Sequence, residues 1–198
     1  FTEIDKVMSR DYIYKTDGVV LTPINLAVGD NGDNKPPKFN GRWYKLFKWK
    51  PPEENTIDYK VEVKRNVEDE EDEIKYVEHN GKIVSYKTLI LRVGYKPEIH
   101  TKHNSCRVMN EELRFPSDYS MVAFQPHNPY IKNIELAYIP IINGTMYCQN
   151  KDIIKDNSIV EFSYEESNGE GFCWIPLRVR NNLMPNDFMT ASNVWRSI

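Results

Sequence analysis

Two lysines, Lys48 and Lys50, stand two positions apart in the run YKLFKWK at 44–50. The run is rich in aromatic residues and predicts a β-strand. Side chains two apart on a strand share a face, so both ammonium groups point the same way and Trp49 points the opposite way, into a core. Like charges on one face repel each other. An anion between the two lysines would remove that cost, and a nucleotide phosphate is a natural candidate.

A second pair of cations, Arg178 and Arg180, has the same spacing in the run WIPLRVR at 174–180. This run also predicts a strand, on which the two guanidinium groups share one face. Arginine suits phosphate because its planar fork of donors matches two phosphate oxygens.

The elements that must position these residues are mostly strands. Twelve tyrosines, eight phenylalanines and many short β-branched runs are typical of a β-rich protein. Antiparallel strands with short turns favour a small closed or partly open barrel. The predicted strands are 12–14, 18–22, 44–50, 57–63, 74–77, 83–93, 120–124, 133–142, 145–148, 158–164 and 172–180.

One helix is predicted at the C-terminal end, where Asn186 or Asp187 can cap it. A change of composition near 51–55, which contains two consecutive prolines, predicts a boundary between two parts of the chain. The apolar residues of the helix recur at three- and four-residue steps, at Phe188, Ala191, Val194, Trp195 and Ile198.

The composition limits the functional classes. With 198 residues the chain fits one large domain or two small ones, and its 40% hydrophobic content is ordinary for a globular protein. Its net charge of −3 means that any contact with nucleic acid must come from a local patch. Three widely spaced cysteines and the lack of a long apolar run or signal peptide favour a reduced, cytoplasmic setting without a membrane. The start at Phe1 indicates an excised fragment.

Three segments resemble motifs of the mRNA guanylyltransferases, the capping members of the nucleotidyltransferase superfamily. DGVVLTP at 17–23 resembles motif IV, and KWKPP at 48–52 with NTID at 55–58 resembles motif V. WIPLRVR at 174–180 resembles the start of motif VI. The resemblance covers nearly the whole chain, and motif V is its most specific part. It points to viral, multifunctional capping enzymes that combine triphosphatase, guanylyltransferase and methyltransferase activities.

The resemblance implies a β-rich α+β fold in three parts. Residues 1–55 would be the C-terminal part of a nucleotidyltransferase domain of the ATP-grasp-like ligase and capping type. Residues 56–182 would be an OB-fold lid domain. Residues 183–198, which include the tail PNDFMTA at 185–191, would form a helix that leads towards a methyltransferase domain.

The resemblance also implies a covalent mechanism. A lysine attacks the α-phosphate of GTP, releases pyrophosphate and carries GMP, which then passes to the 5′-diphosphate end of RNA. Mg²⁺ or Mn²⁺ accompanies GTP and stabilises charge in the transition state. The implied partners are GTP, 5′-diphosphate RNA and the transcription machinery, in the host cytoplasm or the virion.

The motifs assign roles to individual residues. Lys48 and Lys50 would contact the nucleotide phosphates, although lysines on an exposed edge strand are the structural alternative. Arg178 and Arg180 would contact the triphosphate and orient the leaving pyrophosphate. Asp17 would be the acid of motif IV, close to the nucleophile and a candidate metal ligand, although an aspartate before glycine is also a common turn residue.

Two positions depart from the family pattern. Lys15 begins KTDG, which spells the nucleophile motif, but it stands too close to motif V, so we expect the nucleophile to lie outside this chain and the fragment to be inactive by itself. An Asp-Lys pair normally follows the arginines of motif VI, whereas this chain has Asn181 and Asn182. Either this motif is degraded or a loop is missing.

Other interpretations remain open. The same motifs occur in ATP-dependent DNA or RNA ligases, and an OB-fold barrel by itself can be a non-catalytic RNA-binding module. The segment with His100, His103 and Cys106 is either a polar loop or a zinc site that lacks its second ligand pair.

Overall fold

The computed structural model describes residues 2–14, 16, 18–30, 32, 43, 45–66, 68, 71–79, 81–96, 120–181 and 184–198. The chain divides into two compact units, Phe1–Asn55 and Thr56–Ile198. We call them the first unit and the second unit and describe each by itself.

The first unit is small and has little sheet among its described residues. Strands β1 and β2 pair antiparallel in a two-stranded sheet. Helix α1 was not predicted from the sequence, and 12–14 forms no strand: the Tyr12 hydroxyl instead donates to the Val7 carbonyl of α1 at 3.0 Å. The elements are α1 (Thr2–Met8), β1 (Val19–Leu21), β2 (Phe47–Trp49) and the 3-10 helix η1 (Pro52–Glu54).

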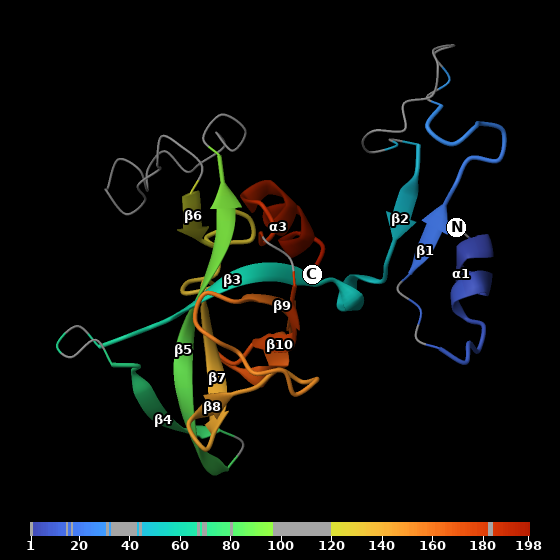
Figure 1. The fold of residues 1–198 in the computed structure, drawn as a ribbon. Coiled ribbons are helices and arrows are strands. Elements are labelled where there is room, and N and C mark those ends of the chain that lie inside the picture. The colour runs from blue at the N-terminus through green and yellow to red at the C-terminus, as the bar shows by residue number, and fades with distance from the viewer. Residues whose placement is uncertain are drawn as a thin grey trace. The chain divides into compact units, whose positions relative to one another are not determined.

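The second unit is built on one curled antiparallel sheet (Figure 1). Along its path the order is β10-β9-β3-β5-β7-β8, and β4 and β6 pair with the two ends of the long strand β5. The elements are β3 (Ile57–Val63), β4 (Ile74–His79), β5 (Lys82–Tyr95), β6 (Ser120–Ala123), β7 (Leu136–Ile142), β8 (Thr145–Met146), β9 (Ile159–Tyr164), the 3-10 helix η2 (Glu166–Asn168), β10 (Trp174–Arg180) and α3 (Phe188–Trp195).

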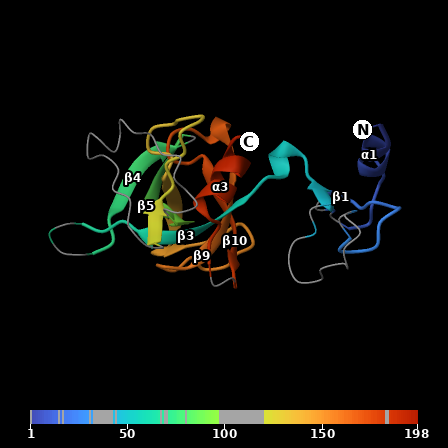
Figure 2. The ribbon, with the colours of Figure 1, turned by 90° about the horizontal axis from the view of Figure 1, so that it is seen from above.

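The two ends of this strand path come together. After β8, the backbone N–H of Gln149 donates to the carbonyl of Pro176 in β10 at 2.9 Å, and that of Asn150 donates to Leu177 at 3.2 Å. In the view from above, the strands curve around a common interior (Figure 2). The β-rich prediction is confirmed, and this curled sheet is compatible with an OB-like fold.

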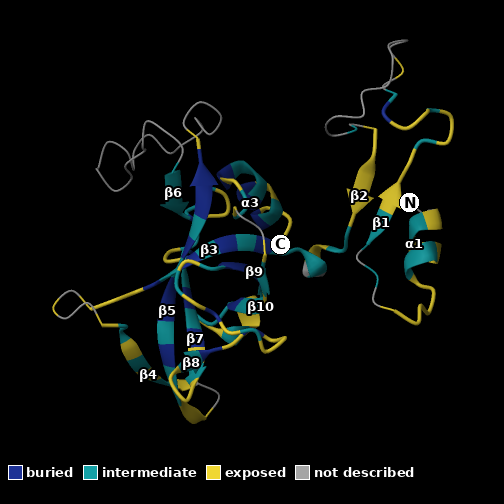
Figure 3. Ribbon diagram, viewed as in Figure 1, coloured by how far each residue is buried: buried dark blue, intermediate teal, exposed yellow. Residues whose placement is uncertain are grey.

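The core of the second unit lies inside the curl. Strand β3 alternates buried and half-buried residues along its whole length, as its sequence pattern predicted. Figure 3 shows the buried residues concentrated on β3, on β9 and on β5 from its middle to its C-terminal end. Tyr59 packs against Phe124 and Trp174, with ring centroids 5.3 and 5.2 Å away.

Helix α3 confirms the predicted C-terminal helix. Asp187 is its N-cap, because the Asp187 carboxylate accepts from the Thr190 N–H at 3.0 Å. The helix buries Phe188, Ala191 and Trp195, and the Trp195 indole donates to the carbonyl of Pro129 at 2.8 Å.

Asn186, just before α3, fastens the helix to the sheet. Its side-chain oxygen accepts from the Asp58 N–H at 2.8 Å, and its own N–H donates to the Asp58 carbonyl at 2.9 Å. Its carbonyl accepts from the Gly94 N–H of β5 at 3.0 Å. The start of β3 and the end of β5 are therefore held at one point. No helix in the described part of the chain is long and apolar enough to cross a bilayer.

Candidate phosphate-binding residues

The two motif-bearing segments of the first unit are neighbours in space. Strand β1 comes from DGVVLTP at 17–23 and β2 from the run that contains Lys48. In their antiparallel register Val19 faces Trp49 and Val20 faces Lys48. The pairing therefore brings together residues almost thirty positions apart in the sequence.

Gly18 explains how closely the segments approach. Its φ is +83°, in the left-handed region that favours glycine. A Cβ at this position would lie 2.0 Å from the carbonyl oxygen of Trp49 and 3.1 Å from the Cα of Lys50. The glycine is thus required by both its backbone conformation and the contact with the chain around β2. In the sequence, the Asp-Gly pair at 17–18 indicates a motif or a turn, and it does not predict this contact.

Lys48 lies on β2, where alternation places it on the face opposite Phe47 and Trp49. It is exposed, and Lys50, which follows the last residue of the strand, is half-buried. The prediction that Trp49 enters a core is wrong for this structure, since the residue is 36% exposed. The reason is that a sheet of two three-residue strands is too small to enclose this side chain.

Several candidate residues lie outside the described part of the chain. These are Lys15 and Asp17, which precede β1 in the sequence, and the segment with His100, His103 and Cys106. Among the residues that are described, no three His, Cys, Asp or Glu side chains are grouped so that they could hold a metal ion. The described residues therefore offer cations for phosphate but no preformed metal centre.

Arg178 and Arg180 of β10 converge on a single carboxylate, Glu161 of β9. The Nε of Arg178 lies 2.5 Å from Oε2 of Glu161, and Nη1 of Arg180 lies 3.4 Å from the same oxygen. A β-bulge between Pro176 and Arg178 shifts the register, so that Arg178 rather than Leu177 stands opposite Glu161. The two arginines therefore share one face, as expected, and the Glu161 carboxylate contacts both of them.

Two further residues complete this cluster at the start of β3. The Thr56 hydroxyl donates to Oε1 of Glu161 at 2.8 Å, and Nε of Arg180 lies 3.4 Å from Oδ2 of Asp58. Asp58 and Glu161 stand directly opposite each other in the β3–β9 register. We call Asp58, Glu161, Arg178 and Arg180 the arginine–carboxylate cluster; it contains two positive and two negative side chains.

Glu161 is ionised in this environment. Burial by itself would raise its pKa, but hydrogen bonds from Arg178 and Thr56, together with the charges of both arginines, outweigh burial and lower the pKa below its ordinary value. Sequence reasoning missed Glu161 because it stands between apolar residues in a strand and belongs to no motif. Its only sequence signal is a carboxylate within an otherwise buried run.

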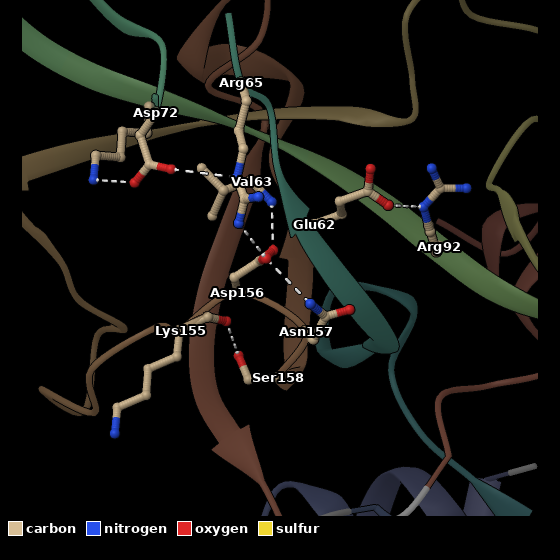
Figure 4. A network of polar contacts seen from close by, with 10 residues as sticks. Glu62, Val63, Arg65, Asp72, Arg92, Lys155, Asp156, Asn157 and Ser158 are labelled. Atoms are coloured by element: carbon tan, nitrogen blue, oxygen red, sulfur yellow. Dashed lines mark hydrogen bonds and ion pairs between the residues drawn. The ribbon is translucent and has the colours of Figure 1, made fainter. Parts of the chain in front are cut away.

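A separate polar network joins β3 to the turn before β9 (Figure 4). Asp156 accepts from the Val63 N–H at 2.9 Å and from Arg65 and Asn157, each at 3.1 Å. Nearby, Arg92 of β5 pairs with Glu62 of β3 at 2.5 Å. The contacts of Asp156 with Val63 and Arg65 and the Glu62–Arg92 pair join segments far apart in the sequence, so they fasten the strands together.

Two hollows on the second unit are lined by residues that the structure describes. One, of about 60 Å³, lies beside Tyr164, Cys173 and Trp174 and is too small for a nucleotide. The other, of about 410 Å³, is lined by Glu62, Arg65 and other residues of the polar network. Neither includes the arginine–carboxylate cluster.

Comparison with known proteins supports the resemblance read from the motifs. The chain is similar to a probable mRNA-capping enzyme of Acanthamoeba polyphaga mimivirus, with 28% identity over 204 aligned residues that cover 93% of the chain. The chain spans 15% of the length of that viral protein. No protein-family model and no solved structure matches the chain. The sequence therefore resembles one segment of a much longer capping enzyme.

Proposed function

We propose that this chain is part of an mRNA 5′-cap guanylyltransferase of the viral, multifunctional kind. The complete protein would transfer GMP from GTP, through a lysyl-GMP intermediate, to the 5′-diphosphate end of RNA. One observation carries the proposal: β1 and β2 pair side by side, and they contain the two motif segments of a chain that is similar to a probable capping enzyme over 93% of its length.

The first unit would contribute phosphate contacts. Lys48 and Lys50 are cations on or next to β2, and each would bind phosphate oxygens of GTP and offset the negative charge that develops during transfer. Asp17 would lie near the nucleophile and help to hold Mg²⁺ or Mn²⁺ brought by GTP. That metal would supply further positive charge at the phosphates. The nucleophilic lysine would come from outside this chain.

The second unit would act as the OB-fold lid domain. Its strand path is compatible with that fold, and β10 carries Arg178 and Arg180. Guanidinium groups bind polyphosphate through paired N–H donors. These two arginines would contact the triphosphate and orient the departing pyrophosphate.

The first unit would belong to a larger nucleotidyltransferase domain. Leu21, Phe47 and Trp49 lie on the same side of the β1–β2 sheet, and they are 40%, 62% and 36% exposed. Such a face normally packs against further polypeptide. A methyltransferase domain would follow α3. The RNA substrate, association with the transcription machinery, and action in the host cytoplasm or virion are further parts of this proposal.

Formation of the covalent enzyme–GMP adduct tests the proposal. In the full-length polypeptide incubated with radiolabelled GTP and Mg²⁺, we expect Lys48→Ala and Lys50→Ala each to lower the rate of adduct formation by about 100-fold, because each removes a cation from the phosphates. Lys45→Ala is the matched control, since Lys45 is exposed just before β2 and should leave the rate unchanged. Wild-type rates in both test variants would contradict the phosphate role.

The choice of nucleotide separates this proposal from its alternatives. Labelling by ATP and not by GTP would identify a ligase-type protein. RNA binding without any covalent labelling, and with affinity that falls steeply as salt rises, would identify a non-catalytic RNA-binding module. The 198-residue chain alone should form no adduct with either nucleotide.

A further inference from the structure

We propose that Glu161 is an internal competitor for polyphosphate: its carboxylate occupies Arg178 and Arg180 and lowers the affinity of this arginine pair for anions. The inference rests on the proposed function only for the identity of the anion, the polyphosphate of a nucleotide. It adds a residue that sets how tightly the second unit holds that anion and how readily it is released.

Glu161 is fixed in place at the centre of the arginine–carboxylate cluster. The residue is only 9% exposed. One of its oxygens accepts from the Thr56 hydroxyl at 2.8 Å, and the other meets both arginines, at 2.5 and 3.4 Å. These contacts fix the Glu161 side chain, so its carboxylate is already in place beside both arginines.

The charges in the cluster balance. Arg178 and Arg180 bring two positive charges, and Glu161 and Asp58 bring two negative charges within 3.4 Å of them. A polyphosphate that approaches the pair therefore meets a neutral cluster, not two uncompensated cations. To bind the Nε side of Arg178 it must displace Glu161, and at the remaining N–H groups it still lies close to the negative charge of that carboxylate. The side chain of Arg178 is 54% exposed and that of Arg180 is 31% exposed, so both are within reach of such a ligand.

Glu161 has two opposite effects on anion binding. Its negative charge weakens binding, whereas its orientation of the arginines strengthens binding. Removing a unit negative charge several ångströms from a bound anion near a protein surface strengthens binding by about tenfold or more. The arginines themselves are partly exposed, so losing the orientation that Glu161 gives them weakens binding by about fivefold. The loss of repulsion is the larger effect, so the structure assigns Glu161 the role of a competitor.

Binding of inorganic tripolyphosphate to the 198-residue chain tests this directly. By calorimetry at low ionic strength, we expect Glu161→Gln to bind about tenfold more tightly than the wild type. Gln keeps the size of the side chain and an oxygen that can accept from Thr56. This gain in affinity should disappear when Arg178→Ala and Arg180→Ala are added, because no arginine pair then remains for Glu161 to compete for.

Glu62→Gln is the matched control. Glu62 also pairs with an arginine across neighbouring strands, at 2.5 Å from Arg92, and its removal changes the net charge by the same amount. If Glu62→Gln tightened binding as much as Glu161→Gln, a general charge effect would replace the proposal. Equal or weaker binding by Glu161→Gln would also overturn it, provided that the arginine variants still weaken binding. If the arginine variants had no effect, the phosphate role of the pair itself would fail, whatever the adduct assay shows for Lys48 and Lys50.

A measurement on the wild-type chain avoids any dependence on the folding of a variant. The carboxyl carbon of Glu161, followed by NMR during a pH titration, reports the protonation of this side chain. Tripolyphosphate should raise the pKa of Glu161, because it competes for the two arginines that now hold that pKa low and adds negative charge beside the carboxylate. An unchanged pKa at saturating tripolyphosphate would contradict the proposal.

Discussion

Arg178 and Arg180 have a structural task in addition to any ligand that they bind. Asp58 and Glu161 stand opposite each other on neighbouring strands, where like charges destabilise a sheet. Arg180 contacts both carboxylates and Arg178 contacts Glu161, so the arginines remove this repulsion. Their replacement would leave two acids close together in a mostly buried place. Loss of activity in arginine variants must therefore be compared with the stability of the fold.

The ionisation of Glu161 links the stability of the second unit to pH. Because its pKa is lowered on folding, ionised Glu161 stabilises the fold above its ordinary pKa of 4.5, and this contribution is lost as the pH falls through the lower, folded-state pKa. We expect the free energy of unfolding to decrease in this acid range, and to decrease less in Glu161→Gln, which has no carboxyl group to protonate. Urea unfolding followed by tryptophan fluorescence, at neutral and acid pH, measures both. Parallel decreases in the two proteins would assign the effect to other carboxylates.

At the scale of elements, the contact between Gly18 and the chain around β2 determines whether the two motif segments can pair. In Gly18→Ala the new methyl group would overlap the Trp49 carbonyl, so we expect β1 and β2 to separate and adduct formation in the full-length polypeptide to fall as in Lys48→Ala. Amide chemical shifts of Val20 and Lys48 report the pairing.

Gly32→Ala is the control for Gly18→Ala. Gly32 lies in the same unit and also has a positive φ, +75°, but a Cβ there would meet nothing within 4 Å. The two variants share the backbone strain and differ in the steric overlap. Equal effects of both on the Val20 and Lys48 shifts would show that strain, and not the close approach to Trp49, is responsible.

The sequence predicted the elements whose burial follows a simple period. Strand β3 alternates because one side faces the core of the curl, and α3 repeats at helical spacing because one side packs on the sheet. The same reasoning placed Trp49 in a core and 12–14 in a strand, and both predictions failed. In the first unit few described residues are buried, so the pattern of apolar residues there does not show which side of a segment faces a core.

The contacts within the candidate sites were beyond sequence reasoning for a different reason. Arg178 meets Glu161 because of a β-bulge, and a one-residue shift in register cannot be read from the spacing of the arginines. Likewise, the contact of Gly18 with Trp49 depends on the register of two short strands separated by a long connection. The sequence identified the cations, and only the fold revealed the carboxylates that neutralise one pair of them.

At the scale of the whole molecule, the two units differ in how much structure holds them together. The second unit encloses a continuous core in which Tyr59, Leu91 and Phe162 are completely buried. The first unit contains a two-stranded sheet with three residues in each strand and exposed apolar side chains. An isolated two-stranded sheet is marginally stable at best in water, whereas a larger sheet around a core unfolds cooperatively.

Hydrogen exchange should therefore divide the chain at the boundary of its units. In the 198-residue chain we expect the amides of β1 and β2 to exchange close to the rate of an open chain, and those of β3, β5 and β9 to be protected to the level of global unfolding. In the full-length polypeptide, the same β1 and β2 amides should become protected, because the exposed face with Leu21, Phe47 and Trp49 would be covered by the rest of the proposed nucleotidyltransferase domain. Mass spectrometry of peptides from both proteins makes the comparison, with β3 as the internal reference. Strong protection of β1 and β2 in the short chain would show that the first unit is stable by itself and would remove one support for that larger domain.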